Sequence, residues 1–580
     1  MQTKDNNRNH DHGNTPEDLI GALIAIVIGV AILLWLGAQL ASLIASGTPL
    51  PASPDDLGII LWNTVTENRS EPANAWPEPH SSHLPGPWLY WTTTILVFGA
   101  LAGLGLGVRK ILADSGQGLD DVERLGSPAE ARLATRKEIK PLRITEPTPG
   151  HYPLGTVDGH VIASESRNSE GNRRTIAGPV AYFGASQSGK TSDVVAALKN
   201  WEGPAIVLSV KGDLAEKTIG LRQQLGEVQI FDPSGFDSSG LTGTWNPLDR
   251  CDSWESAQRL AKRLIDATDQ AGNSSGKFWS QNSIGVLAAF LWLAKGLGKQ
   301  MADVNRWIIG MDEPTEDGPG EVASYLKTLA GGDESNEAVA SFVANELRGL
   351  WKIDSKMKAS YYVTLRSAVA PWSRASVQAA TESTSVSVIW LTERNHNNTV
   401  YITSPLIDQE VLAPVISAFV ADIVDSFMEF NQKTSYVQKP EVLLLLDETA
   451  NMAVPQLPRW ASTLAGLGVQ LVTVWQDVSQ LQTKFGEGAK TILGNSRSII
   501  LYGGCTDPAT FQFVEQLTGS DFHEARLSRL PELGSSGIRD MSLVPPHVLR
   551  QMHTDDRLLI QSNFPLIQMK TLSKMKKKWR

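Results

Sequence analysis

A glycine-rich run near the middle of the chain has the residue types and the spacing of a phosphate-binding loop. Residues 184–191, GASQSGKT, fit the pattern G-x-x-x-x-G-K-[ST]; they follow the apolar run PVAYF and precede the helical run TSDVVAALKNW. Such glycines let successive backbone N–H groups turn toward phosphate oxygens, and the dipole of the following helix adds attraction. The sequence therefore predicts a nucleotide-binding segment made of Gly184, Ala185, Ser186, Gln187, Ser188, Gly189, Lys190, Thr191 and Ser192.

Two carboxylates after a later apolar run could complete that site. Asp447 and Glu448 follow the run VLLLL at 442–446. With Lys190 neutralising the phosphate charge, Thr191 and Asp447 are predicted to hold Mg²⁺, and Glu448 to orient and deprotonate a water. An acidic pair after a strand also fits a surface turn, but the phosphate-binding loop favours catalysis. Lys190 and Glu448 are thus the predicted catalytic residues.

Gln476 is the third predicted catalytic residue. It follows the apolar run QLVTVW at 470–475. Because the carboxyl ends of parallel strands lie at one edge of a sheet, an amide there can sense the terminal phosphate of a nucleotide. A strand that simply ends in a polar loop is the alternative.

Short apolar runs alternate with helical stretches over most of the remaining chain. The predicted strands cover 179–183, 205–210, 228–231, 399–404, 442–446, 470–475, 497–502 and 558–562. Continuous apolar strands separated by helices are typical of a parallel sheet buried on both faces. This alternation of strands and helices stops between 251 and 384, where only helical patterns are found. We therefore predict an α/β fold: a RecA-like P-loop NTPase core with a parallel sheet (151–250 and 385–570) and an inserted all-α domain (251–384).

Two uncharged runs precede this core. Residues 19–44 and 88–108 are each long enough to cross a membrane as a helix. Lys4 and Arg8 precede the first run and Arg109 follows the second, whereas the loop at 45–87 is acidic. The positive-inside rule then predicts two spans with a cytoplasmic tail (1–18), a cytoplasmic linker (109–150) and both termini in the cytoplasm. A cleaved signal peptide is the alternative for the first run, which is long for that purpose.

Composition excludes several classes of protein. The chain has 580 residues, 42% of them hydrophobic and 20% charged, with two cysteines and a net charge of -10. These values exclude a disordered chain and a disulfide-stabilised one. The histidines show no spacing typical of a zinc site. Since the chain is acidic overall, any contact with DNA must be local. The basic tail at 571–580 could contact DNA, anionic lipid or only solvent.

The order of the motifs resembles that of the type IV secretion coupling proteins, the TraG-type ATPases of conjugative DNA transfer. Besides two spans and the two nucleotide motifs, the shared series includes short motifs at 126–131 (GSPAEA), 210–214 (VKGDL), 231–233 (FDP), 245–248 (WNPL), 278–279 (FW) and 479–481 (SQL). The resemblance implies ATP and Mg²⁺ as cofactors, a homo-hexamer at the inner membrane, and a DNA–relaxase nucleoprotein and secretion-channel proteins as partners.

One position departs from that family pattern. Several members carry an arginine just before the glycine that opens the glutamine strand, where it reaches a neighbouring subunit's nucleotide. The corresponding stretch here, 464–468, reads LAGLG, so Arg459 and Arg497 are the nearest substitutes.

Three functions remain open. The resemblance favours a motor that feeds DNA, or protein effectors, to a secretion channel. A DNA pump of the FtsK/HerA type is disfavoured, because little sequence follows the last predicted strand. A membrane receptor that recruits substrate through the helical insertion, with nucleotide as a structural ligand, is the third reading.

Overall fold

The computed structural model of the chain describes residues 16–50, 57–66, 70–76, 80–116, 123–124, 127–128, 131–164, 178–210, 212–268, 274–330, 334–393, 396–403, 405–433, 441–521 and 541–575. The chain divides into two compact units, Met1–Ala129 and Glu130–Arg580. Each unit is described by itself.

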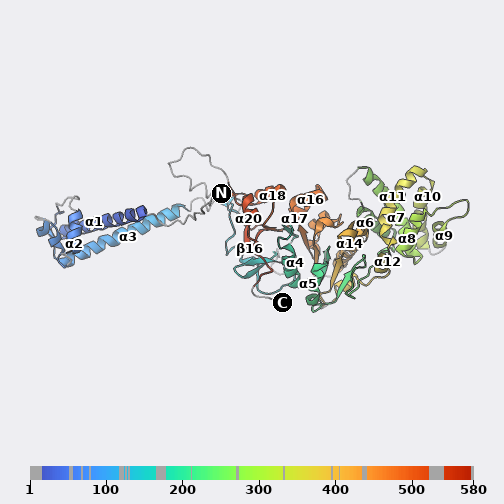
Figure 1. Cartoon of the computed structure of the whole chain (residues 1–580), viewed down its shortest axis with the longest axis horizontal. Coiled ribbons are helices and arrows are strands. Elements are labelled where there is room, and N and C mark those ends of the chain that lie inside the picture. Colours follow the sequence, from blue (N-terminus) through green and yellow to red (C-terminus); the bar gives the residue numbers. More distant parts are fainter. Residues whose placement is uncertain are drawn as a thin grey trace, which may run out of the picture. The chain divides into compact units, whose positions relative to one another are not determined.

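The first unit is a helical hairpin (Figure 1). Helices α1 (Pro16–Ser46) and α3 (Pro87–Gly116) pack along each other, and α2 (Leu57–Thr66), η2 (Pro72–Ala75) and η3 (His80–His83) lie between them in sequence. The stretches Val27–Ser46 and Pro87–Leu104 are long and apolar enough to cross a membrane. Apolar side chains of both helices are exposed, including Ile28, Ile95 and Leu104, as expected for surfaces that face lipid.

The two helices of the hairpin approach closely at Gly37. A Cβ built there would overlap Oγ1 of Thr94, and Oγ1 of Thr93 donates to the Gly37 carbonyl at 3.1 Å. Small residues that allow such contact are common between membrane helices. At the loop end of α1, Gln39 exchanges two hydrogen bonds of 2.9 Å with the backbone of Leu50. The loop is thereby tied to the hairpin.

The second unit is built on a sheet of twelve strands in the order β3-β5-β4-β16-β15-β12-β6-β11-β10-β7-β9-β8. From β12 to β8 all neighbours are parallel, and from β12 through β15 to β3 they are antiparallel. The bounds are β3 Arg143–Ile144, β4 Pro153–Val157, β5 His160–Ala163, β6 Val180–Phe183, β7 Ala205–Ser209, β8 Val228–Phe231, β9 Thr399–Thr403, β10 Val442–Leu446, β11 Val469–Trp475, β12 Ser498–Tyr502, β15 Asp556–Gln561 and β16 Ile567–Lys570. In this unit β13 (Ser520–Asp521) and β14 (Met541–Ser542) form a separate two-stranded sheet, and in the first unit β1 (Glu123–Arg124) pairs with β2 (Ser127–Pro128).

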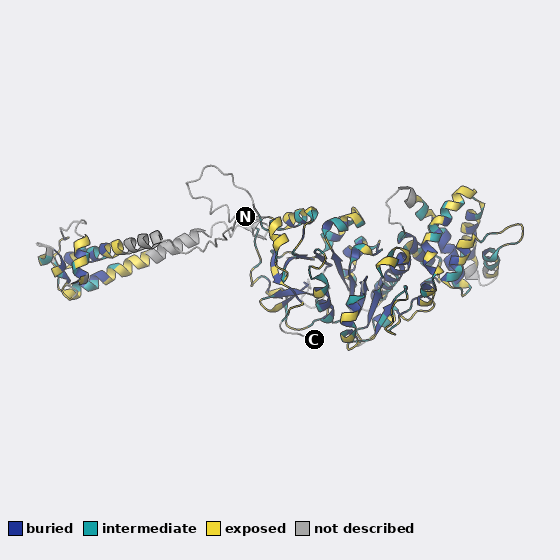
Figure 2. Ribbon diagram, in the orientation of Figure 1, coloured by how far each residue is buried: buried dark blue, intermediate teal, exposed yellow. Residues whose placement is uncertain are grey.

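Alternate residues of the parallel strands enter two different cores. In β6, Ala181 and Phe183 pack in one core, whereas Val180 and Tyr182 pack in the other. Helices α4 (Lys190–Lys199) and α5 (Asp213–Arg222) cover the second face, and the long helix α14 (Gln409–Lys433) covers the first. Burial on both faces, seen as dark blue strands in Figure 2, is why these strands are apolar throughout.

Other short helices connect the strands of this unit. They are η4 Lys140–Leu142, η7 Leu406–Asp408, η8 Thr449–Asn451, α15 Leu457–Thr463, η9 Ala465–Leu467, α16 Val478–Phe485, α17 Gly488–Asn495, α18 Pro508–Thr518 and α20 Pro546–Gln551. The stretch Leu406–Lys433 is also apolar enough to cross a membrane, but 72% of its most apolar window is buried inside the unit. Its apolarity is therefore explained by core packing.

Between β8 and β9 the described elements are all helical. They are η5 Pro247–Arg250, α6 Trp254–Asp266, α7 Ser274–Gly296, α8 Met301–Gly310, α9 Glu321–Ala330, α10 Glu334–Lys352, α11 Ser355–Val369, η6 Ala370–Ser373, α12 Ala375–Ala380 and α13 Val388–Leu391. Helix α7 is central: residues 286–294 are all buried, and α6, α8, α9, α10 and α11 pack against it. Ion pairs to α14 fix the base of this bundle, because Arg263 meets Asp422 at 3.0 Å and Arg250 meets Glu429 at 2.6 Å.

All eight predicted strands are confirmed, with ends shifted by at most one or two residues. The predicted parallel sheet is confirmed from β12 to β8, but the predicted strand at 558–562, β15, runs antiparallel to β12, and four further strands follow it. The prediction that the last strand ends near 562 is also wrong, since β16 follows. The four strands beyond β15 have two to five residues and no long apolar run, so their pairing depends on tertiary contacts.

Candidate nucleotide site

The glycine-rich loop joins β6 to α4 at the carboxyl edge of the parallel strands. Gln187 and Gly189 have φ values of 62° and 96°, which turn the loop before the helix begins at Lys190. Gly184 has no room for a side chain, because a Cβ there would lie 2.6 Å from Cβ of Tyr502. The loop therefore has the tight, helix-capping course that the motif requires.

Two polar groups in the loop fit a phosphate ligand. The ammonium of Lys190 folds back onto the loop, donating to the carbonyls of Gly184 and, at 2.8 Å, of Ala185. The Ser188 hydroxyl is buried and has no hydrogen-bond partner among the described residues. Because buried polar groups in proteins are nearly always paired, this hydroxyl fits a site built for a ligand. Thr191 and Ser192 stand in the first turn of α4.

The predicted acid pair lies two strands away from the loop at the same edge. Asp447 directly follows β10, its N–H donates to the Leu208 carbonyl at 2.9 Å, and its side chain is 5% exposed. Burial raises the pKa of Asp447 to about 6; the charges of Glu448 and Asp213 act in the same direction, and Lys190 opposes them. The structure thus brings together Lys190, Asp447 and Glu448, as well as an acid that the sequence prediction did not assign to the site.

That additional acid is Asp213, the first residue of α5. Its Oδ1 is buried without a hydrogen-bond partner among the described residues, while its other oxygen lies 3.5 Å from the Lys217 ammonium. The available signal was the acid in the turn directly after β7. The described residues contain no group of three or more His, Cys, Asp or Glu side chains placed to ligate one ion. This fits Mg²⁺, which is usually held by one or two carboxylates, waters and substrate phosphates.

A strained turn presents Glu448. Its φ of 52° lies in the left-handed region, which a non-glycine residue adopts at a cost of about 1–3 kcal/mol. The next residue, Thr449, fixes the turn: its hydroxyl donates to the Leu446 carbonyl at 2.8 Å and accepts from the Val474 N–H at 3.2 Å. The Glu448 carboxylate is half-buried and accepts from Asn451 at 3.4 Å.

Gln476 lies beside the loop. The last residues of β6 and β11, Phe183 and Trp475, are register partners, and the Gly184 N–H donates to the Trp475 carbonyl at 3.3 Å. Gln476 follows next, with an exposed side chain and a backbone N–H that donates to Gln480 at 3.0 Å. Its amide is therefore free to move toward a ligand.

The structure places the two proposed substitute arginines differently. Arg497 precedes β12 and packs on Gly178 before β6, at the opposite edge from the loop. Arg459 is exposed in the first turn of α15. By contrast, Arg557 in β15, which no sequence motif marked, packs against Gly189. Lys211 and the residues after 575 lie outside the described residues.

Because Asp447 is buried, we predict that the stability of the fold and the effect of Mg²⁺ on nucleotide affinity both depend on pH. The pKa of Asp447 is raised from 3.8 to about 6, so between these pH values the folded chain keeps a proton that the unfolded chain releases. The free energy of unfolding therefore falls as pH rises from about 4 to about 6. Without Mg²⁺ at pH 7, the free energy of unfolding of Asp447→Asn should therefore exceed that of wild type by on the order of 2–3 kcal/mol. Below pH 4 the two proteins should be equally stable. In wild type, the gain in nucleotide affinity on adding Mg²⁺ should grow from pH 5 to pH 7 and then level off. A gain independent of pH would contradict this assignment.

The strand order β12-β6-β11-β10-β7, the loop after β6 and the acid pair after β10 together define a P-loop NTPase of the RecA-like type. Within that class, the sequence model described as Type IV secretory system Conjugative DNA transfer matches residues 134–574, and the chain belongs to this family. The family predicted from the order of the motifs is thereby confirmed.

Curated relatives and solved structures agree with this family. The chain is 23% identical to Conjugal transfer protein TraG of Escherichia coli over 425 residues (67% of this chain, 63% of TraG). It is 24% identical to Protein VirD4 of Rhizobium rhizogenes over 341 residues (57% and 48%). The chain thus spans about half to two thirds of these relatives. The plasmid coupling protein TrwB, solved with ADP and Mg²⁺, shares the fold with a TM-score of 0.53 at 16% identity, covering 78% of this chain and 95% of TrwB.

Proposed function

We propose that the chain is a membrane-anchored ATPase that couples a DNA–relaxase nucleoprotein substrate to a type IV secretion channel and drives its transfer by ATP hydrolysis. The observation that carries this proposal is the convergence of Lys190, Asp447 and Glu448 at one edge of the sheet, in a member of a conjugative DNA-transfer family. TrwB in complex with ADP and Mg²⁺ supports the same cofactors here.

Each site residue has a distinct role in this proposal. Backbone N–H groups of the loop at 184–189 and the N-terminus of α4 bind the phosphates, and the Lys190 ammonium moves from the loop carbonyls to phosphate oxygens. Thr191 and Asp447 hold Mg²⁺, which neutralises phosphate charge when bound. Glu448 accepts the proton of the attacking water, and Gln476 senses the terminal phosphate.

The hairpin of the first unit anchors the chain in the inner membrane, with two spans and both termini in the cytoplasm. We expect that deleting residues 1–110 transfers the protein from the membrane fraction to the soluble fraction, because the lipid-facing surface is removed. Immunoblots of fractionated cells, with carbonate-washed membranes, measure this. Deleting residues 576–580 is the control and should leave the chain in the membrane. A truncated chain that still sediments with membranes would contradict this anchor.

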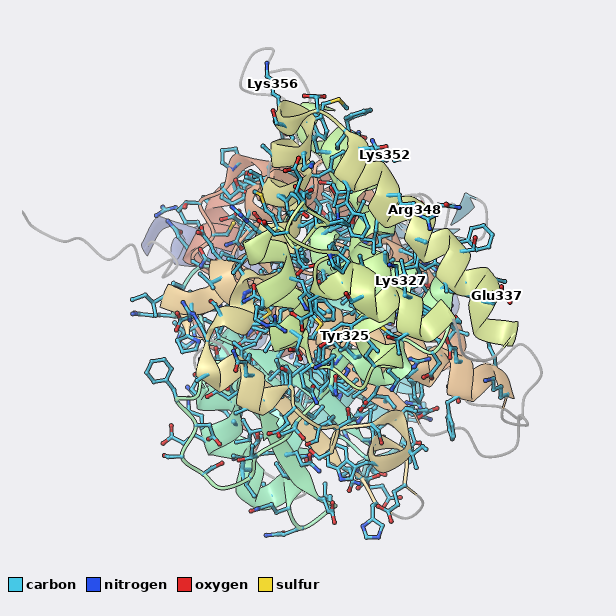
Figure 3. The ribbon with its side chains drawn as sticks, turned by 90° about the vertical axis from the view of Figure 1, so that its right-hand side faces the viewer. Tyr325, Lys327, Glu337, Arg348, Lys352 and Lys356 are labelled. Carbon is cyan, nitrogen blue, oxygen red and sulfur yellow. The ribbon has the colours of Figure 1, made fainter. Side chains whose placement is uncertain are left out.

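The helical insertion offers a local basic surface for the substrate. Lys327, Arg348, Lys352 and Lys356 are exposed on α9, α10 and the start of α11 (Figure 3). None of these four side chains forms an ion pair with another described residue. In an acidic chain, such a cluster supports contact with a phosphate backbone whose strength falls with salt. Assembly as a homo-hexamer and docking to channel proteins complete the proposal.

A receptor that uses nucleotide only as a structural ligand is the second candidate. The absence of an arginine at 464–468 favours it. DNA transfer between cells that carry the chain's own secretion system separates the two functions. Because Glu448→Gln is expected to bind ATP without hydrolysing it, a motor predicts loss of transfer in this variant. Transfer at the wild-type frequency would support the receptor.

A further inference from the structure

A buried arginine from the antiparallel end of the sheet lies against the nucleotide loop. Arg557, in β15, is 2% exposed, and its Nη2 would lie 3.0 Å from a Cβ built on Gly189. Its Nε donates to Asp193 at 3.0 Å, and Nη1 donates to the carbonyls of Thr554 at 2.7 Å and Asp556 at 2.8 Å. The N–H groups of Nη2 make no hydrogen bond with any described residue. Two donors of a buried cation thus remain at the loop.

The guanidinium cannot easily turn away from the loop. It stacks on the ring of Tyr502, 4.0 Å from the ring centroid, and Asp193 holds its opposite edge. Asp193 stands one turn into α4 and is itself held by the Tyr502 hydroxyl at 2.8 Å, the Ser573 N–H at 3.1 Å and the Thr571 hydroxyl. Side chains from α4, β12, β15 and the segment after β16 therefore fix the orientation of Arg557.

Nη2 is not among the fully buried polar atoms without a partner, so its N–H groups are open to a ligand at the loop. A guanidinium pairs with phosphate through its N–H fork more strongly than a neutral donor does. Gly189 is the last loop residue before α4, whose N-terminus is where the phosphates bind. The Ser188 hydroxyl, also unpaired, belongs to the same loop.

We propose that Arg557 binds the phosphate chain of the nucleotide through Nη2, within the same subunit. This inference rests on the proposed function, because it assumes that the loop binds a nucleoside di- or triphosphate. Arg557 would thereby supply a second positive charge beside Lys190 in a chain that has no arginine at 464–468. It also links the bound phosphates to the C-terminal segment through Asp193.

The test is equilibrium binding of fluorescent ADP and a non-hydrolysable ATP analogue to the full-length chain in detergent, with thermal unfolding of each nucleotide-free variant. Arg557→Gln should raise Kd for both nucleotides by about 10- to 100-fold. Arg550→Gln, an exposed arginine on α20, is the matched control and should leave Kd unchanged. Asp193→Asn keeps the guanidinium and leaves an amide oxygen that can accept from its Nε, so it should lower the unfolding temperature and weaken nucleotide binding much less than Arg557→Gln does.

Each outcome decides the proposal. A Kd of folded Arg557→Gln within twofold of wild type would overturn it, as would an Asp193→Asn variant that weakens binding as much as Arg557→Gln does. If Arg557→Gln fails to fold, Arg557→Lys replaces it; one ammonium cannot serve both Asp193 and the loop, so a several-fold rise in Kd supports the proposal and an unchanged Kd overturns it. Wild-type protein that binds neither nucleotide would instead contradict the proposed function.

Discussion

Replacing Lys190 with alanine is expected to abolish ATP hydrolysis and to weaken nucleotide binding. The ammonium of Lys190 donates to the Gly184 and Ala185 carbonyls of the loop, and from there it can reach a bound phosphate. A charge-assisted hydrogen bond contributes about 1.5–3 kcal/mol, so Kd for ATP should rise about 10- to 100-fold. The lost stabilisation of charge on the transferring phosphoryl group should lower kcat by a further ~10²–10³. Phosphate release and calorimetric titration measure the two effects.

Lys199→Ala provides the matched control for this prediction. Lys199 ends the same helix, α4, and lies in its last turn, away from the loop. We expect near wild-type binding and hydrolysis in this variant. Hydrolysis by Lys190→Ala at the rate of the control would show that the loop is not where ATP reacts.

Replacing Glu448 with glutamine is expected to separate binding from turnover. The amide has the size and shape of the carboxylate but cannot accept the proton of the attacking water, which lowers kcat by ~10²–10⁴. The Kd for nucleotide should stay within about twofold of the wild-type value, because Glu448 contacts the attacking water and not the phosphates. The variant should also remain folded, because the turn is held by Thr449 and not by Glu448.

Glu487→Gln is the control for the general base. The Glu487 side chain is 88% exposed and pairs only with Lys490 on the surface, so its loss should change neither binding nor hydrolysis. Single-turnover hydrolysis, with product separated by chromatography, gives the chemical step directly. Wild-type turnover in Glu448→Gln would remove Glu448 from the mechanism, and would leave Asp447 and Asp213 as the carboxylates to test next.

The sequence predicted the parallel part of the sheet and the two nucleotide motifs because both depend on local patterns. Strands buried on both faces, such as β10, are continuous apolar runs, and the loop at 184–191 is a short pattern with a fixed strand and helix around it. Parallel register then brings the ends of β6, β11 and β10 to one edge. The placement of Lys190, Asp447 and Gln476 follows from that alone.

What could not be predicted depends on contacts between residues far apart in the sequence. Arg557 and Asp193 are separated by 364 positions, and nothing local marks either as part of the site. The antiparallel strands β3, β4, β5 and β16 have two to five residues, too few for a sequence pattern to identify them, so their addition to the sheet is decided by packing. The unpaired carboxylate oxygen of Asp213 likewise becomes visible only when β7 and β10 are side by side.

Steady-state ATP hydrolysis by the full-length chain in lipid, with and without single- and double-stranded DNA, tests the central claim most directly. The account predicts Mg²⁺-dependent hydrolysis that DNA stimulates and that Glu448→Gln abolishes. Absence of hydrolysis under every condition, in protein that still binds ATP, would contradict the motor and leave a receptor with a structural nucleotide.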